Sequence, residues 1–369
     1  MHAVTRTESW SPRLRPIAAN PMTAEKARFR KRALRFNLGL ALLVWIVWAV
    51  VGGNAAFHAL FANWRVAVTM VFGSLVGGGT SEGGGAIAFP VFTKLLHISA
   101  PIARNFSLAI QTVGMGAASL SILYLRIPIE RRALLYAGLP GVIGVALGAY
   151  YLAPVFPPAL ARVSFTVMVS SLGVALILIN RSDHESRNEA LPIFGAQEKW
   201  VLVVAGLIGG AVSALVGSGA NAIAFMAMVL LFRISEKIVT PTTVLLMAMV
   251  SLAGFAFHVA VLRDFGATVT SYWLAAVPVV AIGAPLGALI CSYMPRRAIV
   301  LLLLFLIGLE FLSTLLLVPM SRAILFSSAV TLAICAFVNW AMSRATRYRP
   351  ENFPVVPSHE TVETPEAIA

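Results

Sequence analysis

The chain has 369 residues, of which 59% are hydrophobic and only 12% are charged, and its mean hydropathy is +0.86. Soluble domains are about one quarter charged. A set of water-soluble domains, a disordered chain, a collagen-like fibre and a disulfide scaffold are therefore excluded. The formal net charge is +13, which raises the question of where the positive charge lies.

Residues 1–35 form a basic N-terminal tail with nine Lys and Arg residues against Glu8 and Glu25, a net charge of +7. Basic residues ahead of an apolar segment set its orientation and attract anionic lipid headgroups. We therefore expect the lipid bilayer as a partner and no nucleic acid. We expect no cleavable signal peptide, because the first apolar run starts late.

Eight apolar runs have the length of about 20 residues that a membrane-crossing helix needs. They are residues 36–53, 105–125, 133–153, 160–180, 241–262, 270–293, 298–319 and 323–343. Residues 66–96 and 200–232 are apolar runs broken by glycines, and backbone opened inside lipid must be covered by protein. The predicted fold class is an all-α integral membrane protein with about eight transmembrane helices, two re-entrant helical hairpins and an inverted-topology repeat.

The loops that this arrangement places on the side of the N-terminus hold most of the basic residues. They contain Arg126, Arg131, Arg132, Arg181, Arg187, Lys199, Arg233, Lys237, Arg296, Arg297, Arg344, Arg347 and Arg349. Cytoplasmic loops carry an excess of Lys and Arg. We therefore expect a multi-pass protein with cytoplasmic N- and C-termini.

An internal repeat supports the hairpins. The sequence AIAF at 86–89 recurs at 222–225, an offset of 136, and the glycine pair 144 and 148 recurs at 283 and 287. Each unit has three crossings after its hairpin, so the second copy must be inverted, as in many secondary transporters. The predicted organisation is a tail (1–35), an extra span with its outer loop (36–65), repeat 1 (66–180), a linker (181–199), repeat 2 (200–319), a C-terminal span (320–343) and a tail (344–369).

The two breaks contain the small and polar residues that a binding site for an anion needs. The candidates are Gly79, Thr80, Ser81, Glu82 and Gly83 in the first break, and Gly217, Ser218, Gly219 and Asn221 in the second. Glycine lets backbone approach a ligand closely, and free N–H groups at a helix start attract oxyanions. Close helix packing by small residues is the alternative interpretation.

Three titratable residues are candidates for proton coupling. Glu82 lies at the first break, Glu310 lies within the span 298–319, and His258 lies near the outer end of its span. A protonated buried acid can carry a proton through a transporter, and histidine titrates near neutral pH. The alternatives are a capping carboxylate for Glu82, a paired interhelical residue for Glu310 and a structural residue for His258.

Polar side chains also open the span that follows each hairpin. Asn105 and Gln111 do so in the first unit, and Thr242 and Thr243 do so in the second. They could bind the oxygens of an anion, or they could donate to helix carbonyls of their own turn. Cys291 and Cys335 lie in apolar segments. We expect neither a disulfide, nor a metal site, nor a cofactor.

Over residues 66–319 the chain resembles the TauE/SafE family of sulfite exporter-like permeases. The likeness rests on the sequences GAIAFP (85–90), ARNFSL (103–108), TPTT (240–243) with His258 downstream, GAPLGA (283–288) and MPRR (294–297). The resemblance implies transport of sulfite or organosulfonates across the bacterial inner membrane, coupled to protons. This chain departs from the family pattern at Phe106, where a smaller residue is common.

The sequence therefore predicts a secondary transporter that works by alternating access between two inverted repeats, with a small anionic organosulfur compound and protons as its partners. An anion channel of the same fold is the alternative, and a homodimer stays open. An enzyme is disfavoured, because the sequence has no paired nucleophile and base, no HExxH and no phosphate-binding loop.

Overall fold

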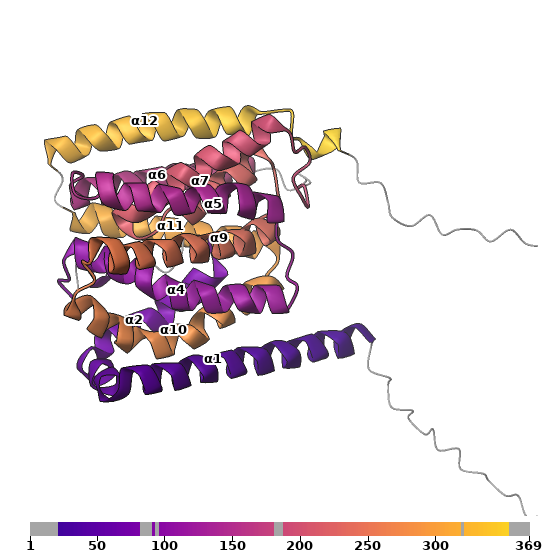
Figure 1. The fold of residues 1–369 in the computed structure, drawn as a ribbon. Helices are drawn as coiled ribbons and strands as arrows, with labels where there is room; N and C mark the ends of the chain where they lie inside the picture. Colours follow the sequence, from indigo (N-terminus) through magenta and orange to yellow (C-terminus); the bar gives the residue numbers. More distant parts are fainter. Residues whose placement is uncertain (1–20, 82–90, 93–95, 181–186, 319–320, 354–369) are drawn as a thin grey trace, which may run out of the picture.

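The computed structural model describes residues 21–81, 91–92, 96–180, 187–318 and 321–353, and helices dominate this part of the chain (Figure 1). The helices are α1 (Pro21–Ala62), α2 (Trp64–Gly79), α4 (Ala100–Tyr124), α5 (Arg131–Leu147), α6 (Pro158–Ile179), α7 (Ala196–Val216), α8 (Ala220–Met226), α9 (Glu236–Phe257), α10 (Ala267–Tyr293), α11 (Arg296–Leu317) and α12 (Arg322–Arg344). Wide π-helical turns continue α5, α8 and α9 at η2 (Gly148–Leu152), η3 (Ala227–Leu231) and η4 (His258–Leu262). The predicted all-α class is confirmed.

Nine of the described helices are long and apolar enough to cross a membrane. Eight of them coincide with the runs predicted from the sequence, and α7 is the ninth. The helix α7 begins at Ala196, four residues before the predicted start of this run, and so reaches 21 residues. The second hairpin is therefore asymmetric, because α8 and η3 together span only Ala220–Leu231.

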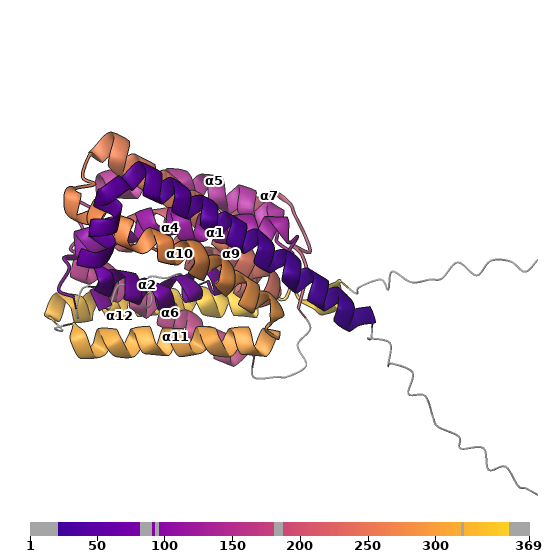
Figure 2. The same ribbon diagram turned by 90° about the horizontal axis from the view of Figure 1, so that it is seen from below.

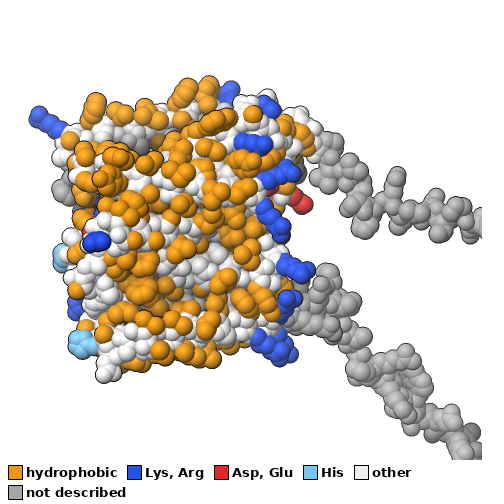
Figure 3. Space-filling view, in the orientation of Figure 1, with side chains coloured by type: hydrophobic (Ala, Val, Ile, Leu, Met, Phe, Trp, Pro, Cys, Tyr) orange, Lys and Arg blue, Asp and Glu red, His pale blue; other side chains and the backbone are white. Residues whose placement is uncertain are grey.

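The two ends of the molecule differ in charge. Figure 3 shows Lys and Arg gathered at the end where α1 begins and α12 ends, with apolar side chains over the face between the ends. We call this end the basic end and the opposite end the distal end. Large apolar side chains such as Val51, Phe61 and Phe326 are more than 70% exposed between them. Such a surface is stable in lipid and not in water.

The two halves of the chain repeat the same backbone irregularities. Among the described residues, four non-glycine residues have positive φ: His97, Arg126, Arg233 and Arg263. His97 and Arg233 are 136 residues apart, and Arg126 and Arg263 are 137 apart, which matches the repeat offset found in the sequence. Helix α4 runs from the distal end to the basic end and α9 runs back (Figure 1), so the second copy is inverted.

Each repeat packs its first hairpin helix on the other repeat. A Cβ atom added at Gly78 of α2 would lie 1.9 Å from Ala284 O of α10, and one added at Gly210 of α7 would lie 2.1 Å from Gly141 O of α5. Only glycine permits so close an approach of two helix backbones. The two repeats are therefore interlocked. If either hairpin helix, α2 or α7, moves, it must slide along a helix of the other repeat.

Helices α1 and α12 lie on the outside, packed on α10 and α6 respectively (Figure 1), and α1 crosses α10 obliquely (Figure 2). Pro278 has no N–H, so the carbonyl of Leu274 lacks its usual helical donor. The Trp48 indole donates to that carbonyl at 2.8 Å, and Trp45 donates to Pro278 O at 2.8 Å. The extra N-terminal span is thus held at a proline kink.

Candidate functional site

The two hairpin breaks meet in the middle of the molecule. The amide of Asn221, at the start of α8, donates to Ser81 O of the first break at 2.7 Å. The Asn221 side chain also accepts from Gly219 N at 3.2 Å. All three residues are buried, and the Ser81 hydroxyl has no hydrogen-bond partner among the described residues. The structure thus brings the two breaks into direct contact.

Helix α4 holds the second break. Gly217 has a φ of 79° and its carbonyl, which the turn frees from the helical pattern, accepts from Gln111 Nε2 at 2.7 Å and from Ser107 Oγ at 3.0 Å. Gln111 Oε1 is buried and lacks a partner among the described residues. Gln111 therefore fixes the break through its nitrogen and leaves its oxygen free for a donor.

Several glycines and hydroxyls of the breaks have a packing role. Helix α2 continues through Gly79, where an added Cβ atom would lie 2.9 Å from Gly287 O. Thr80 donates to Val76 O of its own helix, and Ser218 donates to Asn221 Oδ1 at 3.4 Å. Glu82 and Gly83, the remaining candidates of the first break, lie outside the described residues.

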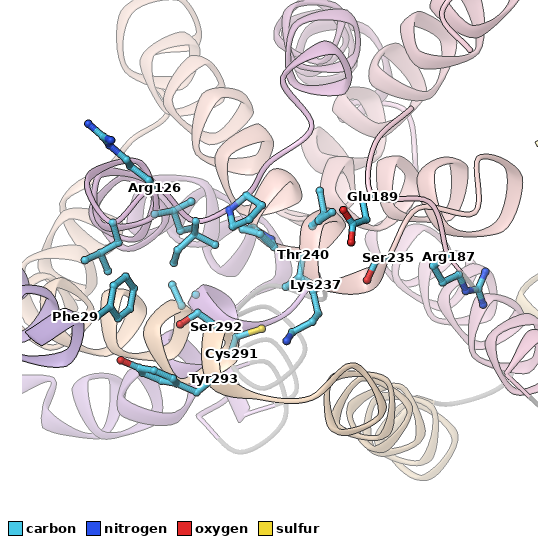
Figure 4. A pocket seen from close by; sticks show the side chains of 18 residues that line it. Phe29, Arg126, Arg187, Glu189, Ser235, Lys237, Thr240, Cys291, Ser292 and Tyr293 are labelled. Carbon is cyan, nitrogen blue, oxygen red and sulfur yellow. The ribbon is translucent and has the colours of Figure 1, made fainter. Parts of the chain in front are cut away.

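A cavity of about 590 Å³ opens at the basic end. Its mouth is formed by the loops before α5 and α9 and by the end of α10, and its inner end reaches Gly78, Thr240 and Pro241. Figure 4 shows Lys237 near Cys291 and Thr240, whereas Arg126 and Arg187 extend outward. The cavity lining holds three cations, Arg126, Arg187 and Lys237, and one carboxylate, that of Glu189. This excess of positive charge favours anions.

The three threonines at the start of α9 differ in their surroundings. Thr242 and Thr243 donate to carbonyls of their own helix, Ile238 O and Thr240 O, at 2.7 and 2.8 Å, and Thr242 also accepts from Glu130 N. Thr240 lines the cavity, and its hydroxyl lacks a partner among the described residues. Thr240, which belongs to the TPTT sequence but was not among the predicted site residues, is the threonine in position to meet a ligand.

A second, small hollow of about 20 Å³ lies between α2, α4 and α10 and is bordered by Gln111. Gly78 borders both this hollow and the larger cavity. A cavity of this size holds about one water molecule. Three residues of α4 mark a line through the molecule: Ile122 lies in the cavity, Gln111 at the breaks and Arg104 at the distal end. At 1.5 Å per residue, the helix covers about 27 Å between Ile122 and Arg104.

A polar cluster lies at the distal end of that line. Asp264 Oδ1 lies 2.8 Å from His258 Nδ1, and Asp264 Oδ2 accepts from Asn105 Nδ2 at 3.2 Å and lies 4.0 Å from Arg104 Nη2. His258 and Asn105 are buried, whereas the Asp264 side chain is 41% exposed. The structure thus joins two predicted site residues, Asn105 and His258, through Arg104 and Asp264, which the prediction had left out.

Glu310 belongs to a different place. Its carboxylate lies 3.1 Å from Arg162 Nη2 and accepts from Thr166 Oγ1 at 3.2 Å, and both charged side chains are at least 94% buried. Neither residue lines the cavity at the basic end. Arg162 lies in the first turns of α6. The sequence left two roles open for Glu310, proton coupling or pairing between helices, and this geometry is that of a paired interhelical residue.

Phe106, the departure from the family pattern, is buried and stacks edge-on against Phe92 at a centroid distance of 4.8 Å. Its ring fills the core between α4 and the segment before it. The larger side chain therefore packs beside the polar line of α4 and does not replace a ligand on it.

The model of one protein family, described as sulfite exporter TauE/SafE, matches residues 66–311, two thirds of the chain. The chain belongs to the sulfite exporter TauE/SafE family. The match begins two residues into α2 and ends within α11, so it covers both hairpins, the cavity and the distal cluster. No curated protein and no solved structure matches the chain. The protein is therefore a multi-pass membrane protein of a family of sulfur-anion exporters.

Proposed function

We propose that this chain is a secondary transporter, and not an enzyme, that exports a small sulfur oxyanion such as sulfite or an organosulfonate, and that it couples this export to protons. The observation that carries the proposal is the asymmetry along α4. A cavity with Lys237 is open at the basic end, the hairpin breaks meet in the middle, and polar contacts close the distal end. An alternating-access transporter has such an arrangement when one side is open.

In this proposal the basic end is cytoplasmic, with both termini on that side of the inner membrane, as the distribution of Lys and Arg predicts. The units that rock against each other are residues 66–180 and 200–319. The substrate enters past Lys237, meets Thr240 and then reaches the breaks, where Gln111, Ser81 and Asn221 are the proposed ligands. His258 is the proposed proton-coupling residue, because it is buried in the distal cluster.

The test is flux of sulfite into liposomes that contain the purified protein. We expect saturable flux that responds to an imposed pH gradient. The variant Lys237→Gln should raise the half-saturating concentration about tenfold, because an ion pair in a partly screened cavity contributes about 1.4 kcal/mol. Arg349→Gln is the matched control, since Arg349 is an exposed cation at the same end that does not line the cavity.

Two outcomes would contradict the proposal. Flux of sulfite that rises linearly with concentration and ignores the pH gradient would indicate an anion channel. Absence of flux for sulfite and for a series of organosulfonates would leave no transport activity to explain.

A further inference from the structure

The distal cluster has the composition of an anion-binding site whose ligand is a side chain of the protein. Arg104, Asn105 and His258 all face one carboxylate, that of Asp264, and they contact both of its oxygens. Two of these three groups are buried at 5% exposure or less, whereas Asp264 is 41% exposed. Asn105 and His258 are therefore held in the protein interior, whereas the carboxylate that they contact lies at the surface.

The repeat relates this cluster to the cavity at the other end. At the offset of 136, Arg104 corresponds to Thr240, Asn105 to Pro241 and His258 to Ile122, and at the offset of 137 that relates Arg126 to Arg263, Asp264 corresponds to Ile127. All four of these counterparts line the cavity at the basic end. The symmetry of the inverted repeat thus relates the cluster at the distal end to the part of the cavity through which, in the proposed function, a substrate enters at the basic end.

The chemistry at the two positions differs. The four counterparts at the basic end carry no charge, and the cations of that cavity come from neighbouring positions such as Lys237. The distal cluster instead carries a guanidinium, an amide and an imidazole. His258 Nε2 is buried and has no hydrogen-bond partner among the described residues. When Nδ1–H donates to Asp264, this nitrogen carries a proton of its own only in the protonated imidazole, which then has a second N–H donor.

Resting on the proposed transport of an oxyanion, we propose that Arg104, Asn105 and His258 form an exit site for that anion, and that the Asp264 carboxylate occupies the site while the distal end is closed. A sulfite or sulfonate group presents three oxygens to donors that now hold two. Asp264 precedes α10 in a short loop, next to Arg263 with its positive φ, and its exposed position allows it to leave without unpacking the buried groups.

The experiment measures equilibrium binding of sulfite to the full-length protein in lipid nanodiscs. Asp264→Asn keeps the shape of the side chain and removes the competing charge. We expect sulfite to bind about tenfold more tightly to this variant than to the wild type. The double variant Asp264→Asn/Arg104→Gln should lose the gain. Glu351→Gln, which removes a carboxylate from an exposed position at the basic end, should bind as the wild type does.

An unchanged affinity in Asp264→Asn, or a gain that persists without Arg104, overturns the exit site. Should Asp264→Asn fail to fold, Asp264→Ser makes the same comparison with a smaller side chain. The result is independent of the transport assay. Sulfite flux in the wild type with no Arg104-dependent gain in binding rejects the exit site alone, whereas that gain without any flux rejects the transport proposal alone.

Discussion

The basic end and the distal end of the molecule are built from equivalent positions of an inverted repeat, but their side chains are arranged differently. At the basic end, Ile122 and Thr240 line an open cavity. At the distal end, their counterparts His258 and Arg104 converge on one carboxylate. The difference teaches that the duplicated fold repeats the same backbone at both ends, and that the side chains at a few positions decide whether an end holds a cavity or a cluster of polar contacts.

The buried ion pair of Arg162 and Glu310 lies outside both the cavity and the distal cluster, and breaking it should have the largest effect on stability. Removing one partner of a buried ion pair leaves the other charge without compensation and costs about 3–5 kcal/mol. We expect Glu310→Ala to lower the free energy of unfolding by this amount, because Arg162 would stay buried. Reversible unfolding in detergent with a denaturant measures the change.

The control for this prediction is the double variant Arg162→Met/Glu310→Leu, which replaces the pair by apolar side chains of similar size. It should recover most of the lost stability. A loss below about 1 kcal/mol in Glu310→Ala would show that the pair is solvated.

The inner end of the cavity depends on close packing of α2 on α10. Gly78→Ala should lower the free energy of unfolding by about 1–3 kcal/mol, because the added methyl group overlaps Ala284 O and the helices must separate. Thermal unfolding of the nanodisc-embedded protein measures the change. Gly116→Ala is the matched control, since a Cβ atom there would meet nothing within 4 Å, and it should leave the melting temperature nearly unchanged.

The smallest change in the free energy of unfolding is expected at the basic end, where the segment after α12 contacts α7. The Tyr348 hydroxyl donates to the buried Glu198 carboxylate at 2.7 Å, and burial together with this carboxylate raises the pKa of Tyr348 from 10.0 to about 12. Tyr348→Phe should lower the free energy of unfolding by about 1 kcal/mol, the typical contribution of one hydrogen bond.

The same contact gives a pH dependence with a defined sign. A pKa that is higher in the folded state stabilises the fold below the unfolded value and loses that contribution as the pH rises through the folded value. The stability of the wild type should therefore fall between pH 10 and pH 12 relative to Tyr348→Phe, as measured by thermal unfolding. Parallel curves for the two proteins would contradict the assigned contact.

Much of this arrangement could be predicted from the sequence because it depends on local patterns. The apolar runs, the glycine breaks and the offset of 136 are visible in one chain. Ser81 and Asn221 were chosen for their place in the breaks, and Asn105 and Gln111 for their place in the span that follows the first hairpin. The length of α7 was underestimated, because the polar residues at its start, including Glu198 and Lys199, read as loop. Glu198 is buried there by its contacts with Gly195 and Tyr348.

The sequence by itself determined that the chain crosses a membrane many times, that its two halves are inverted copies and that the copies break at glycines. These features follow from hydropathy, spacing and residue size, which are properties of segments. Only the tertiary structure decided which end of the molecule has a cavity. The cavity with Lys237 and the convergence of Arg104, Asn105 and His258 on Asp264 depend on how α4, α9 and α10 pack, and side chains 159 residues apart become neighbours only through that packing.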